Sequence, residues 1–230
     1  MKLKNGKQKI IFNKMNQHLK TYYQKRAKEY DRVYQKPERQ ADLKQLHQYL
    51  KTTFDNKTVL EIACGTGYWT KTIAQTCTSI IATDINEAVL EIARKKNYNG
   101  ASVTFKALDL WQLAIPPKPY DSLFGGFIWS HILTTDLPRF LALLKSQLTK
   151  NGELIFIDNK YVKGSNTPIA RTDDAGNTYQ IRRLQNGTAY EVLKNFPSKE
   201  EIEDLIADLG FDMEWMELEY YWVLKLKRLI

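Results

Sequence analysis

Cysteine and histidine are both scarce in this chain of 230 residues. The two cysteines, Cys64 and Cys77, are too few for a disulfide framework, and both stand in apolar or glycine-rich surroundings that suit a buried thiol. The chain has no CxxC pair, and its three histidines, His18, His47 and His131, are dispersed. Because a structural zinc site needs about four converging nitrogen or sulfur ligands, we expect no metal site.

Long apolar runs are also missing. A helix that crosses a bilayer needs about 18 or more consecutive apolar residues, and the apolar part of the N-terminus, residues 10–12, is too short for the core of a signal peptide. We therefore expect a cytoplasmic protein with no membrane contact. Hydrophobic residues make up 43% and charged residues 26% of the chain, which is ordinary for a globular domain.

Acidic residues are absent from the first 20 positions, which hold six lysines, and the whole chain has a formal net charge of +8. A basic excess can attract nucleic acid or an anionic substrate. No nucleic-acid recognition motif accompanies the charge, so we interpret residues 1–15 as a flexible, solvated basic tail.

What the sequence does contain is an alternation of apolar, β-rich runs with helical patterns. Residues 16–35 and 38–53 precede it as two predicted helices, and the second has Leu43, Leu46 and Leu50 on one stripe. The alternating elements are strands at 58–63, 79–84, 101–109, 120–129 and 153–159, and helices at 66–76, 86–97 and 136–149. Such alternation indicates βαβ units and a mostly parallel sheet with helices on both faces.

The pattern changes after residue 159. Residues 160–177 are rich in small polar residues and are predicted to form a loop, and Asn186-Gly187 lies between two strand-like runs over 178–193, which predicts a β-hairpin. A helix is predicted over 198–210, where SKEE is a capping box. The last two runs, FDMEWMELEY and YWVLKLKRL, are predicted strands.

The stretch VLEIACGTG, residues 59–67, ends a predicted buried strand in a glycine turn. Such a turn lets a ligand approach the backbone at the start of the next helix, although glycine turns also close many α/β loops. Two acidic residues make the prediction of a ligand site more specific. Glu61 stands inside the strand, where an unpaired carboxylate is costly, and Asp84 ends the next strand, where an acid can hold a ribose diol. A nucleoside ligand explains both acids.

Two common nucleotide motifs do not fit this turn. The third glycine of the GxGxxG pattern is missing, and Tyr68 and Trp69 at the helix start leave little space for a pyrophosphate. The phosphate-loop pattern fails because no GK[ST] follows. The turn and its acids instead resemble the first motifs of class I S-adenosylmethionine-dependent methyltransferases. The stretches KALDL, YDSLFGGFIWSHI and LLKSQLTKNGELIFID are similar to the later motifs of that family.

This resemblance implies a fold and a cofactor. The fold is α/β, Rossmann-like and doubly wound, with a seven-stranded, mostly parallel sheet whose last strand is antiparallel. Residues 16–230 would form one domain, with a helical lid over 16–53 and a loop and hairpin insertion over 160–197 of the kind that builds acceptor pockets. The implied cofactor is S-adenosylmethionine, which leaves as S-adenosylhomocysteine.

The resemblance also implies which residues hold the cofactor. Gly65 and Gly67, with Ala63 in place of the first glycine of the family, form the turn. Asp84 grips the ribose hydroxyls, and Asp109 accepts a hydrogen bond from the adenine amino group. The other residues expected beside the cofactor are Glu61, Cys64, Trp69, Ile85, Leu110, Phe127, Trp129 and Ser130.

The predicted lid helix carries three further candidates. Tyr22, Arg26 and Tyr30 share one helix face at positions i, i+4 and i+8. The resemblance implies that they close over the sulfonium and meet the ligand carboxylate, while Glu61 meets the ligand amino group. An aromatic helix face is also typical of simple packing, and both interpretations stay open.

His131 follows the fourth strand, beside the expected methyl donor, and is the candidate general base. The alternative is a histidine that orients a loop or bonds to Ser130. Trp69 and Trp129 likewise either cage the sulfonium by cation–π attraction or fill the core. On the hairpin, Arg182 and its neighbour Arg183 either meet an anionic acceptor or form a solvated face.

The function we predict is transfer of a methyl group to an O, N or C atom of a small molecule by in-line displacement, in which the protein supplies orientation and desolvation. One alternative is a module that binds S-adenosylmethionine without catalysis. Another is a nucleic-acid methyltransferase assisted by the basic tail. FIWSH at residues 127–131 replaces the NPPY-type signature of amino-methylating DNA enzymes, which argues against that branch. The sequence names neither the acceptor nor the oligomeric state.

Overall fold

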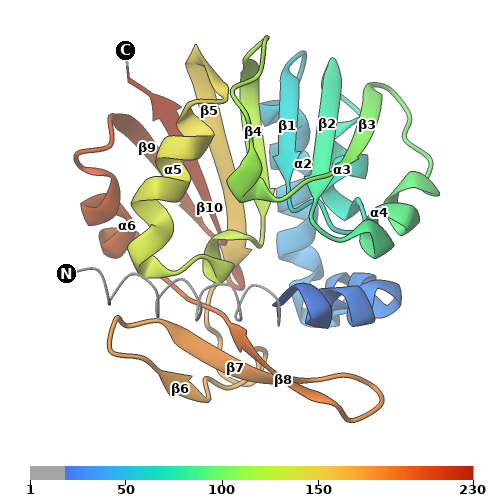
Figure 1. Cartoon of the computed structure of the whole chain (residues 1–230), viewed down its shortest axis with the longest axis vertical. Coiled ribbons are helices and arrows are strands. Elements are labelled where there is room, and N and C mark those ends of the chain that lie inside the picture. Colours follow the sequence, from blue (N-terminus) through green and yellow to red (C-terminus); the bar gives the residue numbers. More distant parts are fainter. Residues whose placement is uncertain (1–18, 230) are drawn as a thin grey trace.

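The computed structural model of the chain describes residues 19–229 and shows a seven-stranded sheet in the order β3-β2-β1-β4-β5-β10-β9 (Figure 1). Its strands are β1 (Thr58–Ile62), β2 (Ser79–Asp84), β3 (Ser102–Ala107), β4 (Tyr120–Gly126), β5 (Leu148–Asn159), β9 (Phe211–Glu217) and β10 (Tyr221–Arg228). The first five run parallel, and β10 lies antiparallel between β5 and β9. The predicted α/β fold is thereby confirmed. The predicted tail, residues 1–15, lies outside the described residues.

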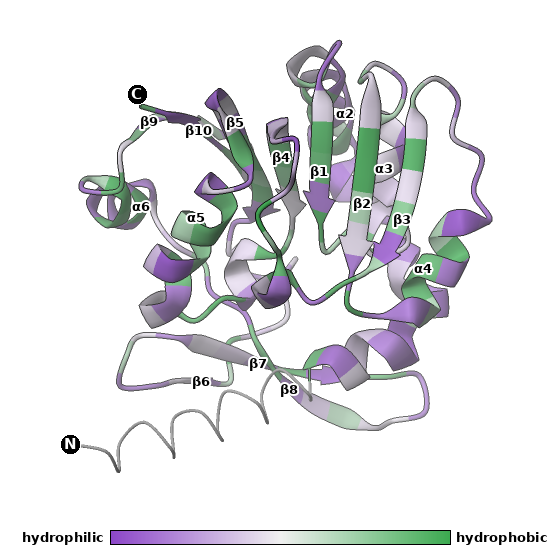
Figure 2. Cartoon of the chain, turned by 45° about the horizontal axis from the view of Figure 1, so that its top comes forward, coloured by the Kyte–Doolittle hydropathy of each residue, from purple (hydrophilic) through white to green (hydrophobic). Residues whose placement is uncertain are grey.

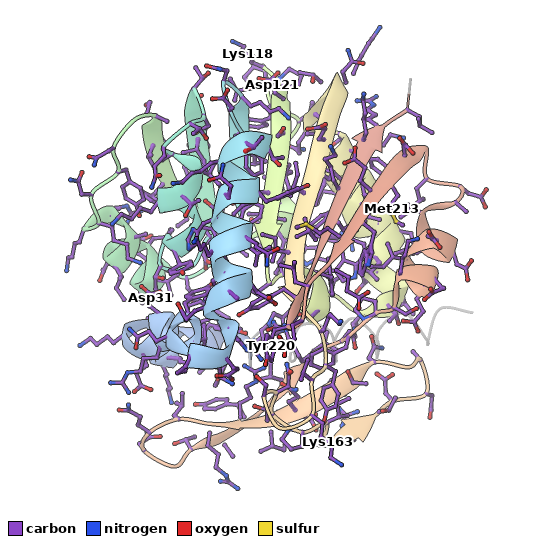
Figure 3. The ribbon with its side chains drawn as sticks, turned by 180° about the vertical axis from the view of Figure 1, so that it is seen from behind. Asp31, Lys118, Asp121, Lys163, Met213 and Tyr220 are labelled. Carbon is purple, nitrogen blue, oxygen red and sulfur yellow. The ribbon has the colours of Figure 1, made fainter. Side chains whose placement is uncertain are left out.

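Helices cover both faces of this sheet. They are α2 (Gln40–Thr53), α3 (Tyr68–Ile73), α4 (Glu87–Arg94), α5 (Leu137–Lys145) and α6 (Lys199–Ile206). Helix α2 lies over one face of the sheet (Figure 3). Its predicted stripe is buried with Ile73 of α3 in one core cluster, and Phe140 of α5 is buried with Ile202 of α6 in another. The middles of β1 and β2 are apolar (Figure 2), as expected for strands covered on both sides. The predicted capping box of α6 is present.

Two predicted element boundaries are wrong. Strand β5 begins at Leu148 rather than at the predicted residue 153, and it contains Asn151-Gly152. A bulge between β4 and β5 accommodates the extra residues, and a Cβ at Gly152 would lie 2.8 Å from the Leu148 Cβ, so only glycine fits there. Strand β4 ends at Gly126, three residues early, because Phe127 adopts a left-handed conformation (φ 61°). A 3₁₀ turn, η4 (Trp129–His131), follows.

The N-terminal segment lies across the carboxyl ends of the parallel strands. Residues 19–26 form an α-helix, which continues as the 3₁₀ helices η1 (Ala27–Gln35) and η2 (Pro37–Arg39). We call residues 19–39 the lid segment. Asp31, marked in Figure 3, fixes it to the rest of the chain: it accepts a hydrogen bond from the Thr66 hydroxyl of the glycine turn and pairs with Lys96 Nζ at 2.7 Å.

A second, small sheet faces the same edge of the large one (Figure 1). It consists of β6 (Arg171–Thr172), β7 (Thr178–Arg183) and β8 (Ala189–Leu193). The predicted hairpin is confirmed: β7 and β8 pair antiparallel, and Gly187 in the turn has a φ of 83°. The lid segment and the hairpin therefore enclose the ends of the parallel strands, where ligands bind in open α/β sheets.

Candidate functional site

A pocket opens at the carboxyl ends of β1, β2 and β4, beneath the lid segment. We call it the main pocket. Its empty space, with the open solvent at its mouth included, is ≈ 1010 Å³. Nine residues that the sequence singled out line it: Tyr30, Ala63, Gly65, Asp84, Ile85, Asp109, Leu110, Phe127 and His131.

The glycine turn between β1 and α3 forms one wall of the main pocket. Ala63, Gly65 and Gly67 all adopt left-handed backbone conformations, with φ values of 50°, 57° and 74°. A Cβ added at Gly65 would meet only the Tyr30 ring, at 4.0 Å, so this position faces open space. A Cβ at Gly67 would lie 2.3 Å from the Tyr98 hydroxyl. Gly65 thus leaves room for a ligand, whereas Gly67 leaves room for the protein itself.

Asp84 at the end of β2 is held by backbone donors. Its Oδ2 accepts from the Gly65 N–H at 2.9 Å, and its Oδ1 accepts from the Asn86 N–H at 2.8 Å. Burial raises the pKa of Asp84 above its ordinary value, although these hydrogen bonds act to lower it. Each oxygen of a carboxylate keeps a further acceptor site. The side chain is therefore fixed in place and can still accept from two hydroxyl groups.

Asp109 and Asn86 add polar groups to the same pocket. One oxygen of Asp109, Oδ1, accepts from the Trp111 N–H at 3.0 Å. The Asn86 side chain donates to the Lys20 carbonyl oxygen of the lid segment, and its own Oδ1 has no hydrogen-bond partner within residues 19–229. A buried amide oxygen without a donor is uncommon in native structures. It marks a place where a donor group of a ligand would be stabilised.

Glu61 lies behind the glycine turn and does not line the main pocket. Its side chain is buried, and Oε2 accepts a hydrogen bond from the Thr70 hydroxyl of α3 at 2.6 Å. Burial raises the pKa of Glu61 to about 8, against the lowering effect of the Thr70 bond. The carboxyl group is therefore largely protonated at neutral pH, which explains how an apolar strand accommodates it.

Six other candidate residues lie beside the main pocket rather than in its wall. Trp129 is packed in the core against Phe156 and Trp222. Arg26 faces an adjoining pocket described below. The remaining side chains are buried in the surrounding protein: Tyr22, Cys64, Trp69 and Ser130. Gly67 and Glu61 likewise do not line the main pocket.

His131 and Tyr23 form a bonded pair in the pocket wall. His131 Nδ1 lies 2.6 Å from the Leu193 carbonyl oxygen, which can only accept, so Nδ1 carries the proton. His131 Nε2 then accepts from the Tyr23 hydroxyl at 2.7 Å. Burial, aided by the charge of Lys194, lowers the pKa of His131 to about 3, so the ring is neutral. Neither ring nitrogen bonds to Ser130.

Sequence reasoning missed Tyr23. Its helix position is compatible with the ligand-facing stripe, because Tyr23, Arg26 and Tyr30 follow i, i+3 and i+7 spacing just as Tyr22, Arg26 and Tyr30 follow i, i+4 and i+8. Periodicity could not choose between the two tyrosines. In the structure Tyr22 is buried, with 1% of its surface exposed, and Tyr23 lines the pocket.

A second pocket adjoins the first and shares Tyr23, Tyr30, Phe127 and His131 with it. We call it the cationic pocket, because five basic side chains and no acidic side chain line it in the described part of the chain. The basic residues are Arg26, Lys36, Arg39, Arg182 and Lys194. They come from the lid segment and from both strands of the hairpin, or directly after them.

Lys194 is tied to a buried carboxylate at the base of the cationic pocket. Its Nζ lies 2.7 Å from Asp158 Oδ1 and donates to the Ser130 hydroxyl oxygen, and both partners are almost fully buried. Burial acts to raise the pKa of Asp158, but the Lys194 charge and hydrogen bonds outweigh it and hold that pKa below its ordinary value. Ser130 therefore belongs to an ionic network that joins β5 to the hairpin.

No group of three or more His, Cys, Asp or Glu side chains within residues 19–229 is placed to hold a metal ion. No helix in this part of the chain has the length and apolar character needed to cross a membrane.

Sequence comparisons point to one kind of domain. A family model described as "Methyltransferase domain" matches residues 59–152. A malonyl-[acyl-carrier protein] O-methyltransferase of Priestia megaterium is 32% identical over 144 residues, 60% of this chain and 50% of that protein. A demethylmenaquinone methyltransferase of Tropheryma whipplei is 23% identical over 169 residues, 70% of each chain. The chain spans about half the length of the first two curated relatives, one of which is an uncharacterised methyltransferase of Geobacillus.

Solved structures show the same fold over nearly the whole chain. A DhpI–SAH complex superposes with a TM-score of 0.78 at 21% identity and covers 94% of this chain and 97% of that one. A DhpI–SAM–HEP complex gives a TM-score of 0.77. An S-adenosylmethionine-dependent methyltransferase from Clostridium acetobutylicum gives 0.62 and covers 90% of this chain. The chain thus has the fold of the class I S-adenosylmethionine-dependent methyltransferases, and its residues 59–152 match the model of a methyltransferase-domain family.

Proposed function

We propose that this protein is an S-adenosylmethionine-dependent methyltransferase that acts on a small molecule. One observation carries the proposal: the open face of Gly65 and the backbone-held carboxylate of Asp84 meet in a single pocket at the strand ends. That combination suits the adenosyl and amino acid parts of the cofactor. The named activities of the relatives support the reaction class and leave the acceptor open.

The residues present fit the cofactor. A side chain at Gly65 would fill the space in which the amino acid part of S-adenosylmethionine would lie. Asp84 would accept hydrogen bonds from the ribose hydroxyls, Asp109 from the adenine amino group, and the unpartnered Asn86 Oδ1 from a donor of the ligand. The bound cofactor supplies an activated methyl group on a sulfonium.

The protein contributes mainly orientation and the exclusion of water. The lid segment covers the main pocket through Leu19, Tyr23 and Tyr30 and is fastened by Asp31 to the glycine turn. An in-line displacement between two reactants held in this way gains from fixed geometry and from a dry site. The acceptor would enter from the cationic pocket, which meets the main pocket at Phe127 and His131.

We propose that His131 acts chiefly as a positioning residue. Its ring is neutral, its Nδ1–H is used by Leu193, and its Nε2 already accepts from Tyr23. A base with a pKa of about 3 removes a proton poorly at neutral pH. The alternative role as general base needs the Tyr23 hydroxyl to turn away, and the arrangement favours acceptor atoms that need no proton removed.

The test begins with binding. Isothermal calorimetry with S-adenosylhomocysteine should give a one-to-one complex. Incubation with methyl-labelled S-adenosylmethionine and a metabolite extract should then transfer label to a small molecule. Tight binding without any transfer would favour the alternative of a non-catalytic binding module, and no binding at all would refute the proposal.

A further inference from the structure

The cationic pocket holds charge that the protein does not neutralise. Lys194 pairs with Asp158, and Lys36 lies 3.8 Å from the exposed Glu38. No carboxylate of residues 19–229 forms an ion pair with Arg26, Arg39 or Arg182, and residues 1–18 contain neither aspartate nor glutamate. Three guanidinium groups therefore face one pocket without an acidic partner.

Arg39 gives the strongest evidence for an anion site because its side chain is buried, with 6% of the residue's surface exposed. Its hydrogen bonds go to neutral acceptors: Asn159 Oδ1 at 2.9 Å and Ser165 Oγ at 2.9 Å. Its guanidinium also lies over the rings of Tyr220 and Tyr221. Burying a cation without a counter-charge is expensive. An anion that enters the pocket would offset that cost.

Arg182 and Arg26 are held in place by neutral groups as well. Both Nε and Nη2 of Arg182 donate to Gln180 Oε1, at 3.1 and 2.6 Å, and Gln180 is fully buried. Arg26 donates to the Tyr22 hydroxyl at 2.8 Å and lies over the Tyr22 and Tyr30 rings. Fixed guanidinium groups recognise oxyanions by paired hydrogen bonds with little loss of side-chain freedom.

The basic groups are close enough to repel one another. Burial is the main cause of the lowered pKa of both Lys36 and Lys194, and the charges of Arg39 and Arg182 lower the pKa of each lysine further. Repulsion of this kind is relieved by an anion placed between the cations. Tyr34, Asn166 and Thr167 add polar groups to the same wall.

We propose that the methyl acceptor is a small molecule with a compact, multiply charged oxyanion, and that Arg26, Arg39 and Arg182 bind this group in the cationic pocket. The inference rests on the proposed function, since it identifies the acceptor side of the same site. A phosphate monoester, a phosphonate and a dicarboxylate share the required chemistry. An ionised oxygen of this group would attack the methyl carbon of the cofactor, so that an O–C bond forms as the S–C bond breaks and S-adenosylhomocysteine leaves. Such an oxygen has no proton to give up, which suits the neutral His131 beside the pocket.

The experiment measures anion binding by calorimetry on protein saturated with S-adenosylhomocysteine. The probes are methylphosphonate, succinate and dimethyl methylphosphonate, a neutral ester that has the same phosphorus centre as the first probe but no charge. We expect one of the two anions to bind and the neutral ester not to bind. A preference for methylphosphonate or for succinate identifies the chemical class of the oxyanion. If the neutral ester binds as tightly as the anions, or if neither anion binds, the inference is overturned.

Two neighbouring arginines of β7 provide a matched pair of variants. Arg182→Gln should weaken anion binding at least tenfold and leave S-adenosylhomocysteine affinity unchanged, and Arg182→Lys should recover part of the loss. Arg183→Gln should change neither affinity, because Arg183 is exposed and does not line either pocket. Equal losses in the two glutamine variants would contradict the inference.

The same data separate the two proposals. Protein that binds S-adenosylhomocysteine but no anion would overturn the acceptor inference and leave the methyltransferase proposal standing. Protein that does not bind S-adenosylhomocysteine would overturn the proposed function, and the acceptor inference with it.

Discussion

At the scale of single residues, the environment decides what each acid of the site does. Asp84 and Glu61 lie near one another at the same strand ends, yet one lines the pocket and the other is sealed behind it. Asp84 is held by two backbone N–H groups, whereas Glu61 has a single hydroxyl partner. This difference makes Asp84 a suitable ligand-binding group and Glu61 a buried, protonated one.

We predict that Asp84→Ala weakens the binding of S-adenosylhomocysteine by about 1–3 kcal/mol, the scale for lost hydrogen bonds to a charged group. Calorimetry on both proteins measures the change directly. Asp204→Ala, on the exposed face of α6, is the control and should bind as the unchanged protein does. Unaltered affinity in the Asp84 variant would remove this residue from the site.

Glu61 should make stability depend on pH. Its folded-state pKa of about 8 exceeds the ordinary value of 4.5, so folding favours the protonated form. The corresponding stability is fully present below 4.5 and is lost as the pH rises through about 8. Glu61→Gln keeps the acceptor for Thr70 and cannot ionise. In thermal melts, the Tm of the Glu61→Gln variant minus the Tm of the unchanged protein should therefore increase between about pH 5 and about pH 8.5. An advantage independent of pH would show that Glu61 is not protonated in the fold.

At the scale of elements, the glycine turn and the lid segment each combine a local change of backbone conformation with a contact to the pocket. Gly65 has a left-handed backbone beside open space, and the lid segment ends its α-helix at residue 26 to continue as a 3₁₀ helix. The Tyr23–His131 bond joins this segment to η4, which follows β4. The lid segment and η4 thus form a wall that the main pocket and the cationic pocket share.

Gly65→Ala should weaken S-adenosylhomocysteine binding by at least about tenfold, because the new methyl group enters the pocket. It also places alanine in a left-handed conformation, which costs about 1–2 kcal/mol of stability. Gly176→Ala is the matched control, since Gly176 has a φ of 79° and no atom within 4 Å of its added Cβ. Both variants should lose a similar amount of Tm, and only the first should lose affinity. Normal affinity in Gly65→Ala would refute the steric argument.

The Tyr23–His131 pair makes a kinetic prediction. Tyr23→Phe should lower kcat several-fold and leave S-adenosylhomocysteine affinity nearly unchanged, because it frees the His131 ring without removing it.

The pH–rate profile of the unchanged protein, measured with the acceptor found by label transfer, should show no limb near the ordinary histidine pKa, since the pKa of His131 is about 3. A limb near neutral pH that disappears in His131→Ala would establish a general base instead.

At the scale of the whole molecule, charge is unevenly placed. The formal net charge of +8 includes five basic side chains in one internal pocket and six lysines among the first 20 residues. Three of these pocket cations, Arg26, Arg39 and Arg182, have a proposed small-molecule partner. Five of the six terminal lysines lie in residues 1–18, outside the described part of the chain, and the sequence predicts a solvated tail over residues 1–15.

Removal of residues 1–14 should therefore leave S-adenosylhomocysteine affinity and label transfer unchanged. Calorimetry and the transfer assay measure both, and an RNA-binding assay on the two proteins completes the comparison. A fall in activity that parallels a fall in RNA affinity would favour the alternative of a nucleic-acid methyltransferase.

Local patterns were enough to predict the main elements. The βαβ alternation, the Asn186-Gly187 hairpin and the capping box at Ser198 all occur as expected, because each depends on neighbours in the chain. The end of β4 and the start of β5 were misplaced, because a left-handed Phe127 and a bulge at Gly152 arise from packing between strands.

The sequence by itself determined the sheet, the glycine turn and the acids at the strand ends, since residue spacing places these features on one edge of a parallel sheet. Only the tertiary structure decided that Tyr23, rather than Tyr22, faces the pocket and that His131 is neutral. It alone gathered Arg26, Arg39 and Arg182 from distant segments into one cavity. The physical reason is that burial and long-range charge depend on which elements pack together, and no local pattern records that.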